Sequence, residues 1–143
     1  MSTQSIYELL GGQETLGVPP PTLDTLRGLL EEGLPFATVE SVRETLALTR
    51  GEVLSVLAVT DRTLIRRKKE HRLQAPESDR LFRLARVAAL ALEVLEDVEK
   101  ARRWLHKPNR ALGGEIPLKL LSTDIGAHQV EELLHRIDHG LFS

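Results

Sequence analysis

Apolar residues recur at steps of three and four along most of the chain, the spacing that places them on one face of an α-helix. The longest run predicts a helix over about residues 76–96, with Pro76 at its first helical position. The apolar face of this helix holds Leu81, Leu84, Ala85, Ala88, Ala91, Leu92 and Leu95. No segment shows sustained period-two alternation, so the pattern predicts an all-α fold.

Capping residues mark the starts of the shorter helices. Thr49 and Glu52 have the spacing of a capping box, in which each side chain accepts from the other residue's backbone N–H. Thr60 is placed to cap a helix that begins at Asp61, an acid suited to the positive end of the helix dipole. With the apolar spacing, these signals predict helices over about residues 22–33, 38–48, 49–58, 61–69, 97–105 and 124–139.

Prolines and glycines divide the chain into three parts. Residues 1–21 contain Gly11, Gly12, Gly17 and three consecutive prolines, and we interpret them as a flexible N-terminal arm. Residues 22–74 are expected to form a helix-turn-helix DNA-binding domain. Residues 75–143 then combine the long helix with a small C-terminal helical domain.

Composition narrows the class of protein. Aromatic residues make up only 3% of the chain, so the core must consist of Leu, Val, Ile and Ala. The absence of cysteine excludes disulfides, thiolate metal sites and thiol nucleophiles. No stretch approaches the ~20 apolar residues of a membrane-spanning helix, and residues 1–10 lack a signal-peptide pattern. We therefore expect a soluble, cytoplasmic protein with no membrane partner.

Charge is distributed unevenly. The chain has a net charge of −2, but residues 61–86 hold nine basic and four acidic residues, a local net charge of +5. A basic segment in an otherwise acidic protein is the electrostatic footprint of a nucleic-acid-binding element. A basic helix can equally be a solvated face, so charge alone leaves both interpretations open.

Residues 49–67 are predicted to form two short helices joined by a tight turn, the second of them basic. In a helix-turn-helix, the second helix enters the major groove with its N-terminal residues at the base edges. Because one such helix contacts only a few base pairs, useful affinity favours a homodimer on a two-fold operator. The candidates, base contacts first and phosphate contacts after, are Arg62, Thr63, Arg66, Arg67, Lys68 and Lys69.

The basic helix also carries a family resemblance. The segment TDRTLIRR at 60–67 resembles the S-x-R-T-L-x-R-R signature in the helix-turn-helix of the Xre/MbcA/ParS antitoxins, with Thr60 in place of Ser. The segment LQAPESDRL at 73–81 is similar to the family's L-S-x-x-E-S-x-R-L, with Gln74 in place of Ser. Further matches are ARRWL at 101–105, Pro108-Asn109, and LGG at 112–114, which resemble the family's toxin-binding domain.

This resemblance implies a type II antitoxin with an Xre/Cro-like helix-turn-helix bundle, continued by the long helix into a small C-terminal toxin-binding domain. It further implies a cognate toxin with a RES domain that depletes NAD. The antitoxin would cover the toxin's active site, assemble into a toxin–antitoxin hetero-oligomer, and repress the shared operon by binding double-stranded operator DNA.

The candidate toxin contacts come from the resembling segments and from the outer side of the last helix. The side chain of Trp104 is assigned either to core packing or to a partner contact. The apolar end of the chain after Gly140 either completes the core or inserts into a toxin cleft beside Arg136. The full set is Trp104, Asn109, Glu131, His135, Arg136, Leu141 and Phe142.

Other functions find less support in the sequence. A stand-alone transcription regulator or partition-type DNA-binding protein would use the same basic helix and dimerise through its C-terminal domain. A helix-turn-helix kept only as a scaffold is a further alternative. No Ser/His/Asp, paired-carboxylate or phosphate-loop motif supports an enzyme or a cofactor. His128, His135 and His139 lack the glutamate of a metalloprotease helix, so no metal site is predicted.

Overall fold

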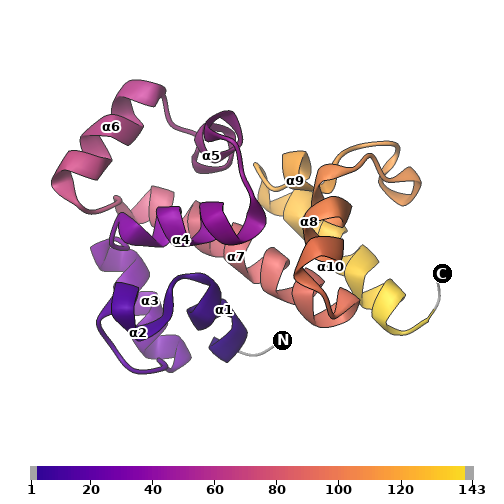
Figure 1. Ribbon diagram of the computed structural model, residues 1–143, viewed down its shortest axis with the longest axis horizontal. Helices are drawn as coiled ribbons and strands as arrows, with labels where there is room; N and C mark the ends of the chain where they lie inside the picture. The colour runs from indigo at the N-terminus through magenta and orange to yellow at the C-terminus, as the bar shows by residue number, and fades with distance from the viewer. Residues whose placement is uncertain (1–2, 141–143) are drawn as a thin grey trace.

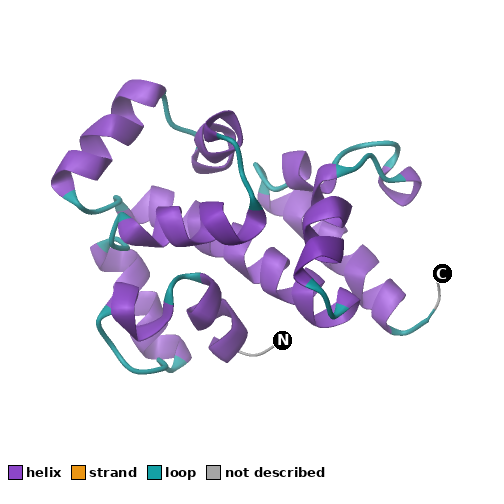
Figure 2. Ribbon diagram, viewed as in Figure 1, coloured by secondary structure: helices purple, strands orange, loops and turns teal. Residues whose placement is uncertain are grey.

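The computed structural model describes residues 3–140, and this part of the chain is helical with no β-strand (Figure 2). The all-α prediction is confirmed. None of the described helices is long and apolar enough to cross a membrane. The elements are α1 (Thr3–Leu9), α2 (Gly12–Leu16), α3 (Leu23–Glu32), α4 (Ala37–Leu46), α5 (Arg50–Leu57), α6 (Asp61–Glu70), α7 (Ala75–Leu95), α8 (Val98–His106), the 3₁₀ turn η1 (Arg110–Leu112), α9 (Pro117–Leu120) and α10 (Asp124–Asp138).

The long helix α7 runs through the middle of the molecule and carries both halves (Figure 1). Helices α1, α3, α4 and α5 pack against it from the N-terminal half, and α8 and α10 from the C-terminal half. Residues 87–91 are all buried. A helix segment covered on every side must be apolar all round, and the run Val-Ala-Ala-Leu-Ala meets this requirement. One continuous core therefore joins the two halves.

The predicted helix starts are confirmed by their caps. Thr49 Oγ1 accepts from the Glu52 N–H at 3.1 Å, and Glu52 Oε1 accepts from the Thr49 N–H at 2.8 Å, which completes the capping box. Thr60, Asp97 and Thr123 each accept a backbone N–H in the first turn of the following helix. Each cap satisfies a donor that the helix itself leaves unpaired.

The expectation of a flexible arm over residues 1–21 is wrong for residues 3–16, which form α1 and α2 against the core. Ile6, Leu9 and Leu10 are at most 5% exposed. The Tyr7 hydroxyl donates to the Val18 carbonyl at 2.6 Å and fastens α1 to the segment after α2. Helices this short are marginal alone and form here because packing on α4 and α7 stabilises them.

Polar contacts fix the C-terminal half against the N-terminal half. Arg102 Nε on α8 donates to the Thr45 carbonyl of α4 at 2.6 Å. His106 Nε2, also on α8, lies 3.3 Å from a carboxylate oxygen of Glu52, the capping residue of α5. The orientation of α8 is therefore set by contacts with the last turn of α4 and the first turn of α5.

Candidate nucleic-acid interface and partner-binding surface

Helix α6 has caps at both ends that its own sequence supplies. Thr60 Oγ1 accepts from the Thr63 N–H at 3.1 Å and donates to Thr63 Oγ1 at 3.1 Å. His71 ends the helix in the left-handed conformation, with φ of 62°. Thr63 is half-buried and its hydroxyl takes part in the cap, so its predicted base contact stays a prediction. In Figure 1, α6 lies at one end of the molecule, far from α8, α9 and α10.

The outward side of α6 is mostly basic. Arg62, Ile65, Arg66 and Lys69 follow the i, i+3, i+4, i+7 spacing of one helix face, and all four are exposed. Lys68 is exposed beside them. None of the four basic side chains forms an ion pair with another described residue. This face is therefore free to attract a polyanion.

The two acids of α6 are paired with arginines and do not oppose that charge. Arg50 Nε lies 2.5 Å from Asp61 Oδ1, and Arg67 Nη1 lies 3.2 Å from Glu70 Oε1. A groove of about 490 Å³ separates α6 from α4 and α5. One acid, Glu40, lines it together with the basic residues Arg43, Arg50, Lys68, Lys69 and His71.

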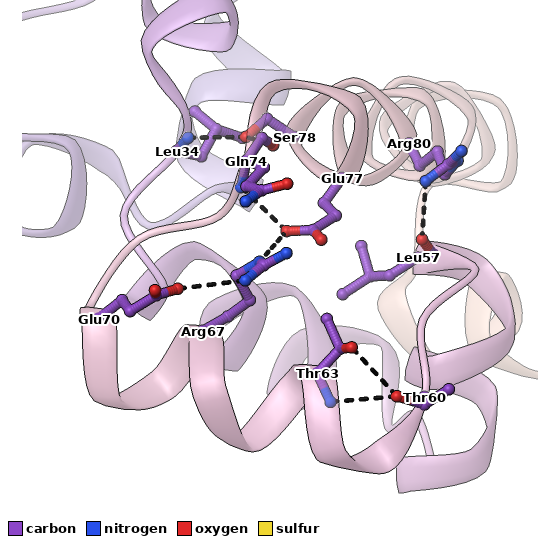
Figure 3. A network of polar contacts seen from close by, with 10 residues as sticks. All are labelled: Leu34, Leu57, Thr60, Thr63, Arg67, Glu70, Gln74, Glu77, Ser78 and Arg80. Atoms are coloured by element: carbon purple, nitrogen blue, oxygen red, sulfur yellow. Dashed lines mark hydrogen bonds and ion pairs between the residues drawn. The ribbon is translucent and has the colours of Figure 1, made fainter.

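Arg67 does not occupy the position predicted for it. Its side chain is 7% exposed, because it continues the inward face that Leu64 begins three residues earlier. Arg67 Nε donates to Glu77 Oε1 of α7 at 2.7 Å (Figure 3). The predicted phosphate contact by Arg67 is therefore wrong, and this guanidinium holds α6 against α7.

The carboxylate of Glu77 is ionised because its partners outweigh its burial. Burial raises the pKa of Glu77, but hydrogen bonds from Arg67 and from the Gln74 N–H lower it by more. The pKa of Glu77 therefore lies below its ordinary value. The hydrogen bond to Glu77 likewise raises the pKa of Arg67. Next to this pair, Ser78 Oγ accepts from the Leu34 N–H at 2.8 Å. Figure 3 shows that these bonds join α6, α7 and the segment before α4.

The C-terminal candidates on α8 and the following loop are partly used by the fold. Trp104 is half-buried and packs against the core, the first of its two predicted roles. Asn109 Oδ1 accepts from the Ala111 N–H at 2.9 Å, and the Asn109 N–H donates to the Glu115 carbonyl at 2.9 Å. Asn109 therefore shapes the loop that contains η1, and its toxin contact stays a prediction.

The candidates on α10 divide between its two sides. Glu131 accepts from Arg86 Nη2 of α7 at 2.9 Å and its side chain is 18% exposed, so the expectation that it is free for a partner is wrong. His135 and Arg136 are exposed, as predicted. Leu141 and Phe142 lie outside the described residues.

A groove of about 470 Å³ opens between the η1 loop and α10. Its apolar floor is formed by Leu112, Leu120 and Leu133, and its exposed rim includes the side chains of Gln129, Glu132 and Arg136. An apolar centre with a polar rim is the composition of a protein-binding surface. Gln129 and Glu132 were not among the residues predicted from the sequence. They lie three residues apart, and Arg136 follows four residues after Glu132, so this spacing places all three on one helix face.

Residues suited to a metal do not gather anywhere in the range 3–140. No group of three or more His, Asp or Glu side chains is placed to hold an ion there. His128 Nε2 lies 3.4 Å from Glu132 Oε1, and His139 Nδ1 lies 2.6 Å from the His135 carbonyl oxygen. The histidines of α10 therefore belong to its surface.

Comparison with known proteins finds a family match for each half of the chain. Residues 25–86 match the Antitoxin Xre-like helix-turn-helix domain, and residues 90–140 match the Antitoxin Xre/MbcA/ParS C-terminal toxin-binding domain. The chain is 33% identical over 131 residues to Antitoxin Xre of Photorhabdus laumondii, which covers 90% of this chain and 88% of that protein. The chain belongs to the Xre/MbcA/ParS antitoxin family. This antitoxin family is non-enzymatic, and its two matched domains meet inside α7.

Two further relatives support the assignment of this antitoxin. Antitoxin Xre of Yersinia enterocolitica is 30% identical over 130 residues, which is 90% of this chain and 88% of that protein. Among solved structures, the M. tuberculosis MbcT-MbcA toxin–antitoxin complex contains a chain with a TM-score of 0.58 and 29% identity. The likeness covers 76% of this antitoxin and 96% of that chain. The predicted family is confirmed.

Proposed function

We propose that this antitoxin binds operator DNA through the exposed face of α6 and neutralises its cognate toxin through its C-terminal helices. The observation that carries the proposal is the placement of the two faces at opposite ends of α7 (Figure 1). A toxin that covers α8 to α10 leaves α6 accessible, so one chain has room for both partners at once.

The DNA-binding half rests on charge and shape. The exposed face of α6 presents Arg62 in its first turn and Arg66 one turn later, and the N-terminal part of the second helix meets base edges in a helix-turn-helix. Lys68 and Lys69 follow two and three residues after Arg66 and are positioned for phosphates, at the edge of the groove toward α4 and α5. A homodimer would place two such helices in successive major grooves and supply the affinity that one helix lacks.

The toxin-binding half rests on the groove between the η1 loop and α10. Its apolar floor and its rim of Glu132, Gln129 and Arg136 suit a protein segment with a buried apolar anchor and polar flanks. From the family resemblance we assign the partner to the RES-domain toxins, whose NAD-depleting site the antitoxin would cover within a cytoplasmic hetero-oligomer.

Salt dependence tests the DNA-binding half. Lys69→Ala removes one exposed charge from α6, and we expect it to reduce the slope of log K against log salt by about 1. Lys100→Ala removes an exposed lysine from α8 and serves as the matched control, with an unchanged slope. Equal slopes for the two variants would contradict the assignment of α6.

Co-expression with the product of a neighbouring RES-type gene, taken as the cognate toxin of this proposal, tests the toxin-binding half. We expect the wild-type chain to co-purify with that toxin and to restore growth and cellular NAD. Co-purification with NAD still depleted would contradict neutralisation. A neighbouring partner without effect on NAD would contradict the RES assignment and leave toxin binding intact.

A further inference from the structure

The exposed face of α6 contains one large apolar side chain that the fold does not bury. Ile65 is 46% exposed, whereas the adjacent Leu64 is 4% exposed and supplies the contact of α6 with the core. Arg62 precedes Ile65 by three residues and Lys69 follows by four, so both lie on the same side of the helix. Ile65 therefore adds an exposed apolar surface beside these cations, at the edge of the groove that α6 forms with α4 and α5.

In the major groove, the apolar group on the base edges is the C5-methyl of thymine. Arg62 and Arg66, which lie on either side of Ile65 in the sequence, would bring α6 close to the DNA. An aliphatic side chain held in the major groove is stabilised when it covers a methyl group. We propose that Ile65 is a specificity-determining residue that packs on a thymine methyl in each operator half-site. The proposal rests on the DNA binding proposed above for α6.

The surroundings of Ile65 favour DNA over a protein contact. Ile65 lies in the middle of α6, within the stretch that begins at the Thr60 cap and carries Arg62 and Arg66. Arg62, Arg66 and Lys69 have no ion-pair partner among the described residues. A protein surface that covered Ile65 would have to neutralise all three cations, whereas the phosphates beside a major groove already do so.

The test compares thymine with deoxyuridine, which lacks only the methyl group. The preferred sequence of the full-length chain is first selected from a random duplex library. Each thymine of that sequence is then replaced by deoxyuridine, and binding is measured for the wild type, Ile65→Ala and the control Ile125→Ala. Ile125 is 76% exposed on α10, so its change removes a similar apolar surface outside α6.

We expect a single deoxyuridine, placed at the contacted position of either half-site, to weaken binding by the wild type and by Ile125→Ala about fourfold, the equivalent of ~0.8 kcal/mol for one buried methyl-sized group. Ile65→Ala should bind the thymine and deoxyuridine operators equally. An Ile65→Ala variant that responds to deoxyuridine as the wild type does would overturn the proposal. The same holds if Ile65→Ala alters dimerisation or toxin binding and leaves the deoxyuridine response intact. If the wild type binds no DNA, the proposed DNA binding fails as well. If the wild type binds DNA and deoxyuridine has no effect at any position, the proposed role of Ile65 is excluded and the proposed DNA binding stands.

Discussion

Arg67 on α6 donates a hydrogen bond to Glu77 on α7 across 2.7 Å, and both side chains are 7% exposed. The same carboxylate oxygen accepts the Gln74 N–H at 2.9 Å, at the start of α7. One acid therefore begins the long helix and fixes the direction of the candidate DNA-binding helix. The orientation of α6 is tied by this pair to the helix that continues into the toxin-binding domain.

Removing Arg67 should destabilise the fold far more than removing its neighbour. Arg67→Ala leaves Glu77 buried and unpaired, and we expect a loss of about 3–5 kcal/mol in the free energy of unfolding. Arg66→Ala changes an exposed side chain and should stay within about 0.5 kcal/mol. Urea unfolding followed by circular dichroism measures both. A paired change, Arg67→Met with Glu77→Leu, should recover most of the loss; equal stability of the two single variants would refute the pairing.

Stability should depend on pH through Glu77. Its folded pKa lies below the ordinary value of 4.5, so its pairing stabilises the fold above that pH and the contribution disappears as pH falls through the folded pKa. We expect the wild type to be more stable than Glu77→Gln at pH 7, with a difference that narrows below about pH 4.5. Urea midpoints from pH 7 to pH 3 provide the comparison. A difference that stays constant over this range would contradict the ionised pair.

Gly126 is required where α10 passes close to α9. A Cβ at this position would lie 1.9 Å from the Leu120 carbonyl oxygen, so the backbones must separate to admit it. We expect Gly126→Ala to lower the melting temperature and to weaken toxin binding. Gly28→Ala is the control, because its Cβ meets no atom within 4 Å and alanine favours the helix by up to about 1 kcal/mol. A Gly126→Ala variant that melts like the wild type would show that α9 yields.

The sequence predicted features that depend on residues near one another in the chain. The capping box of Thr49 and Glu52, the Thr60 cap and the position of α7 are all confirmed, because such signals act within one or two helical turns. The basic character of α6 was also predictable, because the charged residues of a segment can be counted from its sequence without knowledge of the tertiary structure.

The wrong predictions concern residues whose positions depend on packing against other segments of the chain. The burial of Arg67 depends on the approach of α7, ten residues later, although its i, i+3 spacing with Leu64 was a signal of the inward face. Glu131 was assigned to a free surface because its partner Arg86 lies 45 residues away. The prediction of an arm over residues 1–21 rests on glycines and on three consecutive prolines, whereas the apolar positions Ile6, Leu9 and Leu10 pack on the core and stabilise helices at residues 3–16.

The groove beside α10 provides a charge-reversal test of toxin binding. Glu132→Arg changes an exposed rim residue, and we expect it to weaken neutralisation of the co-expressed toxin at least about tenfold, the cost of placing a like charge or a bulky group in a complementary surface. Asp138→Arg makes the same charge change on the same helix outside the groove and should neutralise normally. Equal neutralisation by both variants, with unchanged melting, would exclude the groove.

The separation of the two binding faces is tested most directly by measuring operator and toxin affinity on one full-length variant, Arg62→Ala with Arg66→Ala. Both changes remove exposed side chains of α6, at the end of the molecule opposite α10. We expect operator binding to weaken at least about thirtyfold, since each arginine that contacts a base contributes ~1–3 kcal/mol. Toxin affinity should stay within about twofold of the wild type. Unchanged operator binding, or toxin binding lost in a variant that melts like the wild type, would contradict the assignment of the two faces.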